Sequence, residues 1–269
     1  MDYWDNNDLL HSFANVKSIS IQTIDYCNRK CGWCPNSHME KSKDSLMTLE
    51  TLTRVLDEIE SIKFDGRIHL YLLEEPLCDD RIVDIIALVR KRLPLNTIYI
   101  STNGDYLDTK IKVRDLFEAG LSELSVMMYD NSNTERLIKY SADPRIALIK
   151  KEEMGDCWYN RGGHINVKCD FPVETCEWVF HKVYITRKGE LIVCCSDYDY
   201  EVIYGNLMDQ SLVDIWLSPK YKLYRIAHFF KHGQVLPLCD RCNRLKPKEV
   251  LPNGKIRKRW PFFRSSSQV

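Results

Sequence analysis

The sequence predicts an α/β fold: a partial (open) TIM-like barrel of about six strand–helix units, followed by a small cysteine-rich domain. Strand and helix patterns alternate over the first 150 residues with short connections, which is typical of parallel α/β units. A closed eight-unit barrel takes about 250 residues, whereas the alternation fades after residue 150. Beyond residue 176 the pattern changes to a hairpin, a helix and paired cysteines.

Each predicted element follows from the spacing of its apolar residues. Alternating apolar side chains predict strands, and apolar side chains three or four residues apart predict helices. The predicted strands are 16–24, 67–73, 96–101 and 123–129, and the predicted helices are 48–61, 79–91 and 109–119. Gly120 is expected to end the last of these helices. In the cysteine-rich region, the sequence predicts a hairpin around Lys188-Gly189 and one helix over 211–230.

Polar motifs follow the first three predicted strands. "CNRKCGWC" (27–34) follows the first strand, "EEP" (74–76) the second and "TNGD" (102–105) the third. In parallel α/β folds, the functional loops lie at the carboxyl ends of the strands. The three motifs are therefore expected to meet at one mouth of the barrel.

Composition narrows the class of protein. Hydrophobic residues make up 44% of the chain and charged residues 28%, which is ordinary for a globular protein. The formal net charge is zero, so no global field attracts nucleic acid or an anionic membrane. The N-terminal stretch "MDYWDNNDLL" lacks the pattern of a signal peptide, and no apolar run is long enough for a membrane span. A cytoplasmic location is therefore expected.

Eleven cysteines in a cytoplasmic chain indicate metal ligands or redox groups rather than disulfides. Cys27, Cys31 and Cys34 form an early cluster. Cysteine thiolates hold the four irons of a [4Fe–4S] cluster, and three of them leave one iron open to another ligand. A zinc site that His38 completes is the alternative.

The C-x3-C-x2-C motif after the first strand, with Trp33 before its last cysteine, resembles that of the radical S-adenosylmethionine (radical SAM) superfamily. This resemblance implies that SAM chelates the open iron and is reductively cleaved to a 5′-deoxyadenosyl radical. The radical then abstracts a hydrogen atom from the substrate. It also implies that Trp33 packs near the adenine.

Two further motifs extend the resemblance to the SAM-binding residues. Glu75-Pro76 matches the end of the family's Gly-Gly-Glu-Pro motif, which implies that Glu75 accepts the SAM amino group. Leu73 and Glu74 replace the two glycines, which normally allow close backbone approach to the ligand. "STNGDYL" resembles the third-strand motif, which implies SAM contacts by Ser101, Thr102 or Asn103. An ordinary Asn-Gly turn is the alternative for this segment.

The late cysteines resemble the auxiliary-cluster region called a twitch domain, a truncated relative of the SPASM domain. The matching residues are Cys176, Cys194, Cys239 and Cys242. The resemblance implies a second [4Fe–4S] cluster in which every iron has a protein ligand, and a four-cysteine zinc site is the alternative. The expected regions are the radical SAM core (1–168), the auxiliary-cluster domain (169–248) and a basic aromatic tail (249–269).

Within the superfamily, the motifs most resemble those of enzymes that oxidise a secondary alcohol of an aminocyclitol or sugar. This implies a small-molecule substrate, an electron donor such as flavodoxin or ferredoxin, and a substrate-orienting or deprotonating role for Arg161 in "NRGG" (160–163). The alternative enzyme reaction is epimerisation or crosslinking of a short ribosomally made peptide. In that reaction Cys195 or Cys78 would return hydrogen, whereas Cys157 and Cys169 have no assigned role. A zinc-binding interaction protein without catalysis is the remote alternative.

Overall fold

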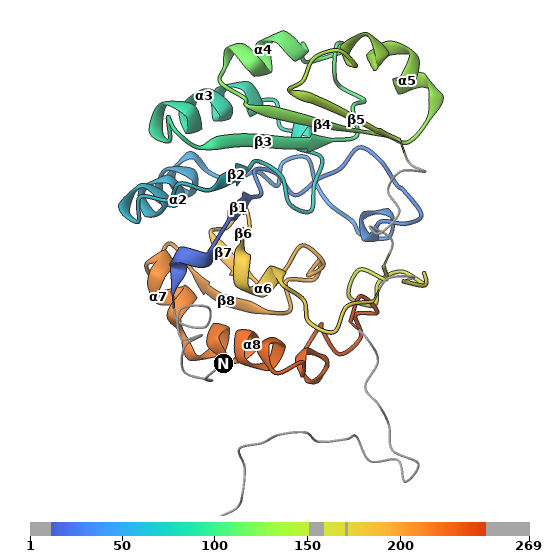
Figure 1. Cartoon of the computed structure of the whole chain (residues 1–269). Coiled ribbons are helices and arrows are strands. Elements are labelled where there is room, and N and C mark those ends of the chain that lie inside the picture. The colour runs from blue at the N-terminus through green and yellow to red at the C-terminus, as the bar shows by residue number, and fades with distance from the viewer. Residues whose placement is uncertain (1–11, 151–158, 170–171, 246–269) are drawn as a thin grey trace, which may run out of the picture.

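The computed structural model describes residues 12–150, 159–169 and 172–245 (Figure 1). The predicted basic tail (249–269) and Cys157 lie outside these residues. Among the described helices, none combines the length and the apolar content that a membrane span requires.

One open sheet organises the described residues, with the strand order β5-β4-β3-β2-β1-β6-β7-β8. Six strands run parallel to their neighbours, and the last two pair antiparallel. They are β1 (Ser18–Ile21), β2 (Arg67–His69), β3 (Thr97–Thr102), β4 (Glu123–Met128), β5 (Ile146–Lys150), β6 (Lys182–Ile185), β7 (Glu190–Ile192) and β8 (Ile203–Asn206). The predicted α/β class and the open barrel are therefore confirmed.

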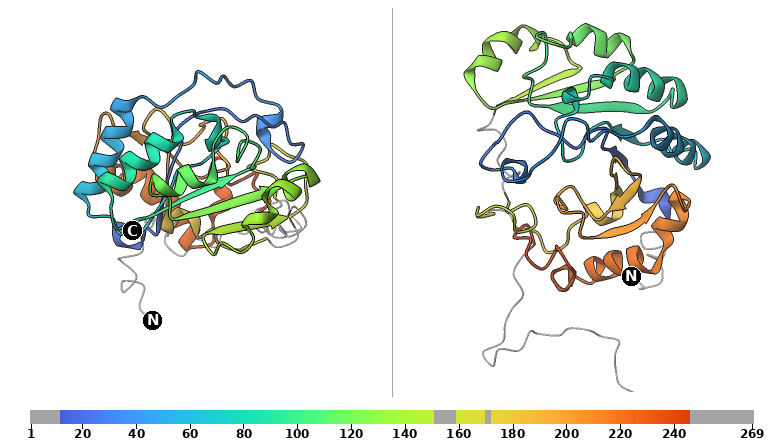
Figure 2. Two further views of the ribbon diagram at one scale, coloured as in Figure 1. Left: turned by 90° about the horizontal axis from the view of Figure 1, so that it is seen from above. Right: turned by 180° about the vertical axis from the view of Figure 1, so that it is seen from behind.

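A helix follows each of the first four strands. These helices are α2 (Leu49–Ser61), α3 (Ile82–Arg92), α4 (Val113–Glu118) and α5 (Asn131–Leu137). Figures 1 and 2 show α2, α3 and α4 side by side along one face of the sheet. Thr48 caps α2, because its side chain accepts a hydrogen bond from the amide of Thr51.

The two faces of the sheet differ in chemistry. Ile19 and Ile21 of β1 are fully buried and belong to the apolar core that includes Leu56 and Ile59 of α2. On the other face, Ser20 is in register with His69 on one side and Tyr184 on the other. Alternation along each strand thus separates an apolar helix-facing layer from a polar and aromatic inner layer.

The structure corrects the predicted helix over 211–230. Two helices occupy this segment, α7 (Leu212–Leu217) and α8 (Pro219–Phe229), and Ser218 between them is extended with ψ of 150°. The ring of Pro219 disfavours a helical conformation for the residue before it, so the first helix ends there. The predicted hairpin is present: β6 and β7 flank Gly189, which has a φ of +79°.

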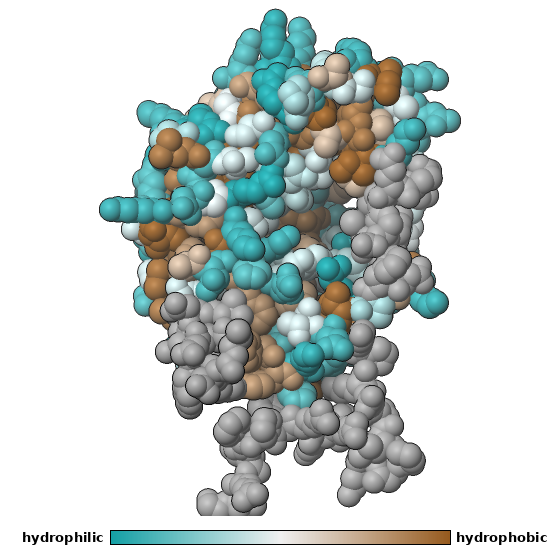
Figure 3. Space-filling model, viewed as in Figure 1, coloured by the Kyte–Doolittle hydropathy of each residue, from teal (hydrophilic) through white to brown (hydrophobic). Residues whose placement is uncertain are grey.

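Sequence patterns missed α5 and β5. The segment of α5 is "NSNTERL", which carries little apolar periodicity, and Asp130 caps it by accepting a hydrogen bond from the amide of Asn133. The strand β5 is half-buried at the end of the sheet order. Figure 3 shows polar side chains over much of the surface in that view, with apolar residues in smaller patches between them.

The auxiliary region continues the sheet of the core. Strand β6 pairs in parallel with β1, from Ser18 opposite Lys182 to Ile21 opposite Ile185. A buried carboxylate adds a second link, since Glu58 of α2 accepts a 2.7 Å hydrogen bond from the amide of Leu212 at the start of α7. The regions expected at 1–168 and 169–248 therefore share one sheet and one apolar core.

Replacing Glu58 tests this link. Glu58→Ala leaves the buried amide of Leu212 without its acceptor, so we expect the free energy of unfolding to fall by about 1–3 kcal/mol. Urea denaturation followed by circular dichroism measures the change. Glu50→Ala, at an exposed position of the same helix, serves as the matched control. Equal stability of both variants would show that the Glu58 contact contributes nothing.

Candidate cofactor sites at the strand ends

The first candidate site is the loop that follows β1. It carries Cys27, Cys31 and Cys34, which form no disulfide with a described residue and are only partly exposed. The amide of Cys34 donates a 2.9 Å hydrogen bond to the carbonyl of Cys31, which folds the loop into a turn. Burial raises the pKa of Cys27 to about 12, although a backbone hydrogen bond at Arg29 opposes the shift. The donor set of three closely spaced thiols fits the three protein ligands of an open iron–sulfur cluster.

The "TNGD" segment holds this cysteine loop in place. Asn28 and Arg29, both inside the cysteine motif, each donate a 2.7 Å hydrogen bond to Oδ2 of Asp105. Asn133 donates to the other oxygen of Asp105, and Asn103 donates to Oδ1 of Asn28. Burial opposes the ionisation of Asp105, but the bonds from Arg29, Asn133 and Asn28 outweigh it and lower the pKa of this carboxyl.

Asn28, Arg29 and Asp105 are site residues that sequence reasoning missed. Their signal was present, because each lies within a motif that had been singled out for other residues. A complementary pair, a cationic Arg29 in one motif and an anionic Asp105 in the other, indicated that the two loops could bind each other.

Glu75 lies at the centre of the second and third motifs. Its Oε1 accepts hydrogen bonds from Thr102 Oγ1 at 2.5 Å and from the amide of Leu77 at 3.1 Å. Its Oε2 accepts one from the amide of Asn103 at 2.7 Å. Burial raises the pKa of Glu75 to about 7, and these hydrogen bonds oppose the rise. Because a carboxylate has about four acceptor positions, roughly one remains for a ligand.

The other predicted SAM contacts lie around this carboxylate or near the cysteine loop. Thr102 and Asn103 contact Glu75, so they orient the carboxylate. Ser101 is half-buried on β3 and in register with Ser125 of β4. The Trp33 ring packs against Tyr129, which directly follows β4, with ring centroids 5.6 Å apart. An aromatic wall therefore lies on one side of the cysteine loop.

Glu74 replaces a glycine of the family motif and turns back on its own loop. Its Oε2 accepts hydrogen bonds from the amides of Leu72 at 3.1 Å and Leu73 at 2.8 Å. Burial raises the pKa of Glu74 to about 8, and those backbone hydrogen bonds oppose the rise. The Glu74 carboxylate thus stabilises the strand-end loop, whereas the neighbouring Glu75 contacts the third motif.

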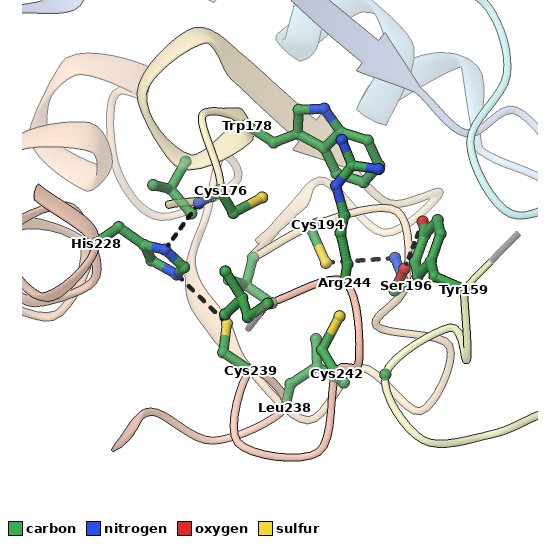
Figure 4. Close-up of a pocket in the computed structure, with 14 residues that line it drawn as sticks. Tyr159, Cys176, Trp178, Cys194, Ser196, His228, Leu238, Cys239, Cys242 and Arg244 are labelled. Atoms are coloured by element: carbon green, nitrogen blue, oxygen red, sulfur yellow. Dashed lines mark hydrogen bonds between the residues drawn. The ribbon is translucent and has the colours of Figure 1, made fainter. Parts of the chain in front are cut away.

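The second candidate site is a cavity among the late cysteines (Figure 4). Its lining includes Cys176, Cys194, Cys239 and Cys242. Burial raises the pKa of all four thiols, that of Cys176 to about 11. Four thiols around one largely apolar space fit a fully ligated [4Fe–4S] cluster, because thiolates bind iron and a metal drives their deprotonation.

The spacing of these ligands bears on the zinc alternatives. Within the described part of the chain, no three His, Cys, Asp or Glu side chains are grouped closely enough for one metal ion.

A short loop joins the two cysteine sites. It runs from Cys194 through Cys195 to Tyr198, whose hydroxyl lies 3.7 Å from the Sγ atom of Cys34. Cys195 is partly buried and packs against an apolar cluster that includes Tyr184 and Tyr198. The loop thus carries a polar group from the auxiliary site to the first cysteine site.

Arg161 lies close to the same loop. Its Nη1 donates a 2.9 Å hydrogen bond to the Tyr159 hydroxyl, and its guanidinium lies 4.6 Å from the centre of that ring. Tyr159 in turn shares a 3.0 Å hydrogen bond with Ser196. Arg161 has a φ of +49°, and an added Cβ on the next residue, Gly162, would lie 2.6 Å from Leu238. The glycine therefore permits close packing with the auxiliary region.

Two further cysteines do not line the cavity. Cys78 is buried, and its Sγ atom lies 3.7 Å from Oδ1 of Asn28. Burial raises the pKa of Cys78 to about 12. Cys169 is partly buried.

Comparison with known proteins places these sites in a family. A relative from Niallia circulans, S-adenosyl-L-methionine-dependent 2-deoxy-scyllo-inosamine dehydrogenase, is 24% identical over 240 residues, which cover 84% of this chain and 92% of that protein. GTP 3′,8-cyclase of Clostridium perfringens is 34% identical over 119 residues, but these cover only 42% of this chain and 34% of the cyclase.

Solved structures share the fold. BtrN in complex with AdoMet and 2-DOIA has a TM-score of 0.74 at 24% identity and covers 85% of this chain and 93% of its own. An open conformation of BtrN has a TM-score of 0.66 at 21% identity, with 85% and 92% coverage. Streptococcus suis SuiB bound to precursor peptide SuiA has a TM-score of 0.50 at 12% identity, with 88% and 72% coverage.

Two family models match along the chain. The model of an iron–sulfur cluster-binding domain, SPASM, matches residues 176–243, which include all four late cysteines. The model of the radical SAM superfamily matches residues 21–167, more than half of the chain and all three early cysteines. The protein therefore belongs to the radical SAM superfamily and carries a SPASM domain.

Proposed function

We propose that this radical SAM enzyme is a dehydrogenase that oxidises a secondary alcohol of a small polyhydroxylated molecule, an aminocyclitol or sugar. The observation that carries the proposal is the loop from Cys194 to Tyr198, which joins the auxiliary site to Cys34 over four residues. An oxidation needs an electron acceptor close to the carbon that loses hydrogen, and this loop places the two cysteine sites close together. The relative named as a dehydrogenase aligns over both regions.

The cofactors supply the redox chemistry. When bound, SAM and its cluster supply the radical that takes a hydrogen atom from the carbinol carbon, and the auxiliary cluster supplies an electron acceptor. The alcohol would lose that hydrogen atom to the radical, its hydroxyl proton to a base such as solvent water and one electron to the auxiliary cluster, which together balance its oxidation to a ketone. A reductant of the flavodoxin or ferredoxin class would provide the electron that cleaves SAM.

The chain holds and orients these groups. Cys27, Cys31 and Cys34 would hold the open cluster, and the remaining acceptor position of Glu75 would receive the SAM amino group. Trp33 would pack near the adenine, and Thr102 and Asn103 would position Glu75, with Ser101 beside them. The four late cysteines would hold the auxiliary cluster.

Arg161 would orient the substrate. Its guanidinium has five N–H donors, of which Tyr159 accepts one from Nη1, so further donors are available for substrate hydroxyl groups. Stacking on the Tyr159 ring restricts its position. An arginine remains protonated at physiological pH, so we assign it hydrogen-bond donation rather than proton abstraction.

A second candidate function is the radical modification of a short ribosomally made peptide. The structural likeness to SuiB bound to its precursor peptide favours this class. In an epimerisation, the partly buried thiol of Cys195 would return a hydrogen atom to the opposite face of the carbon radical. The dehydrogenase proposal needs no such thiol, so Cys195 distinguishes the two.

The first test combines product analysis with two variants. Reconstituted enzyme, SAM, dithionite and an aminocyclitol in deuterated buffer should yield one ketone for each 5′-deoxyadenosine. Cys27→Ala should abolish 5′-deoxyadenosine formation because the open cluster loses a ligand, whereas Cys195→Ala should still form ketone. Mass spectrometry measures both products. If wild-type enzyme instead places solvent deuterium at an inverted carbon, and Cys195→Ala does not, the reaction is an epimerisation and the dehydrogenase proposal is wrong. If the protein binds stoichiometric zinc and does not cleave SAM, both proposed reactions are wrong.

The second test concerns Glu75. Glu75→Gln removes the charge that accepts the SAM amino group, so we expect SAM affinity to fall roughly 10- to 100-fold. Because the pKa of Glu75 is raised to about 7, its carboxylate is lost as the pH falls through 7, and wild-type affinity should fall with it. Glu75→Gln should show no such dependence between pH 6 and 8 in isothermal titration calorimetry.

Glu74→Gln is the matched control for this measurement. The Glu74 carboxylate faces the amides of Leu72 and Leu73, so its variant should bind SAM within about twofold of wild type and keep the wild-type pH dependence. If Glu74→Gln were the weaker binder of the two, the role assigned to Glu75 would belong to its neighbour.

A further inference from the structure

We propose that His228 donates a hydrogen bond to the Cys239 sulfur and thereby raises the reduction potential of the auxiliary cluster. The inference rests on the proposed function in one respect, that the four late cysteines hold an electron-accepting cluster. It assigns to His228 the role of a positioning residue that acts through Cys239.

The position of the proton follows from the two contacts of the ring. His228 is fully buried near the end of α8. Its Nδ1 lies 3.4 Å from the backbone nitrogen of Cys176, whose N–H donates to it. A ring nitrogen that accepts a hydrogen bond carries no proton, so the neutral ring carries its proton on Nε2.

The protonated nitrogen points at a cysteine of the cavity. Nε2 lies 3.6 Å from the Sγ atom of Cys239, and the donation therefore runs from His228 to the sulfur. Figure 4 shows the ring between Cys176 and Cys239, with both contacts drawn. One side chain thus bridges the backbone of one candidate ligand and the thiol of another.

The surrounding backbone restricts the ring to this place. A Cβ added to Gly233 would lie 2.3 Å from Cε1 and 2.8 Å from Nε2 of His228, so only glycine leaves room for the imidazole. Thr175 Oγ1 donates a 3.1 Å hydrogen bond to the carbonyl of His228, which ties this end of α8 to the segment before Cys176.

The direction of the effect follows from charge. A reduced cluster carries one more negative charge than an oxidised one, and its cysteine sulfurs carry part of that charge. An N–H donor to a sulfur stabilises the reduced form more, so the reduction potential rises. Apolar residues such as Val179, Leu238 and Leu245 line the cavity, and their low polarity strengthens this interaction. A higher potential favours uptake of the substrate electron.

The experiment measures the potential in the reconstituted full-length enzyme. Electron paramagnetic resonance redox titration with and without SAM separates the clusters, because SAM alters the signal of the open cluster and leaves that of the auxiliary cluster. His228→Leu should keep about eight irons per chain, four for each cluster, and shift the auxiliary midpoint potential to a more negative value. His228→Gln, whose amide keeps an N–H near Nε2, should restore a potential near that of wild type.

Gly233→Ala provides a second variant if His228→Leu does not retain its cluster. Gly233 does not have a positive φ, so alanine suits the backbone, and its Cβ would overlap Cε1, Nδ1 and Nε2 of His228, so the ring has to leave the position from which it contacts Cys239. We expect a negative shift of the auxiliary potential with the iron content unchanged. The midpoint potential is measured without alcohol oxidation. The inference about His228 can therefore fail while the proposed dehydrogenase function stands, and the proposed function can fail while the inference stands.

Three outcomes would overturn the inference. The first is an unchanged auxiliary potential in both His228→Leu and Gly233→Ala. The second is a potential in His228→Gln as negative as that in His228→Leu. The third is strong nitrogen coupling to the auxiliary cluster in the wild-type electron spin echo spectrum, which would make His228 an iron ligand.

Discussion

The parallel pairing of β6 with β1 is the constraint on which both cofactor sites depend. The four residues of β1 lie in register with four residues of β6 that are more than 160 positions later in the chain. Parallel strands end at the same edge of a sheet, so the cysteine loop after β1 and the turn after β6 emerge on the same side. Strand β7 then returns antiparallel along β6 to Cys194, and the loop that follows brings Tyr198 back to Cys34.

A second level of order comes from polar contacts between strand-end loops. Asp105 receives hydrogen bonds from Asn28 and Arg29 of the cysteine loop and from Asn133 of α5. Charge-assisted bonds of this kind are strong where solvent is partly excluded. Glu75 does the same for the second and third motifs. The cofactor-binding loops are therefore ordered by their mutual contacts, with each motif completing the hydrogen bonding of another.

Burial gives both sites a common electrostatic character. The thiols of Cys27 and Cys176 and the carboxyl of Glu75 all have raised pKa values because they lie in surroundings that disfavour charge. Such groups ionise readily only when a compensating cation is bound. The chain thus provides donors whose charge is matched by iron or by a ligand amine, and apolar surroundings that strengthen each of those interactions.

Local patterns in the chain were sufficient for the alternating units of the core. The periods of apolar residues in β1, α2, β3 and α3 reflect which face each element buries, and this information is local. The spacing of Cys27, Cys31 and Cys34 is likewise local, and so is the break before Pro219, which periodicity alone overlooked. The motif residues named for cofactor binding could also be placed at successive strand ends, because each motif directly follows a strand whose own pattern is local.

Contacts between distant segments could not be predicted in this way, because no apolar period and no motif specifies which earlier strand a later strand will pair with. The place of β6 beside β1, the network around Asp105 and the bridge from Cys176 through His228 to Cys239 each join residues that are far apart in the chain. The glycines after Arg161 illustrate the point. Their small size permits a close approach, and the structure shows that Leu238 lies against Gly162 and Arg241 against Gly163. Only the packed chain shows which neighbour a missing side chain makes room for.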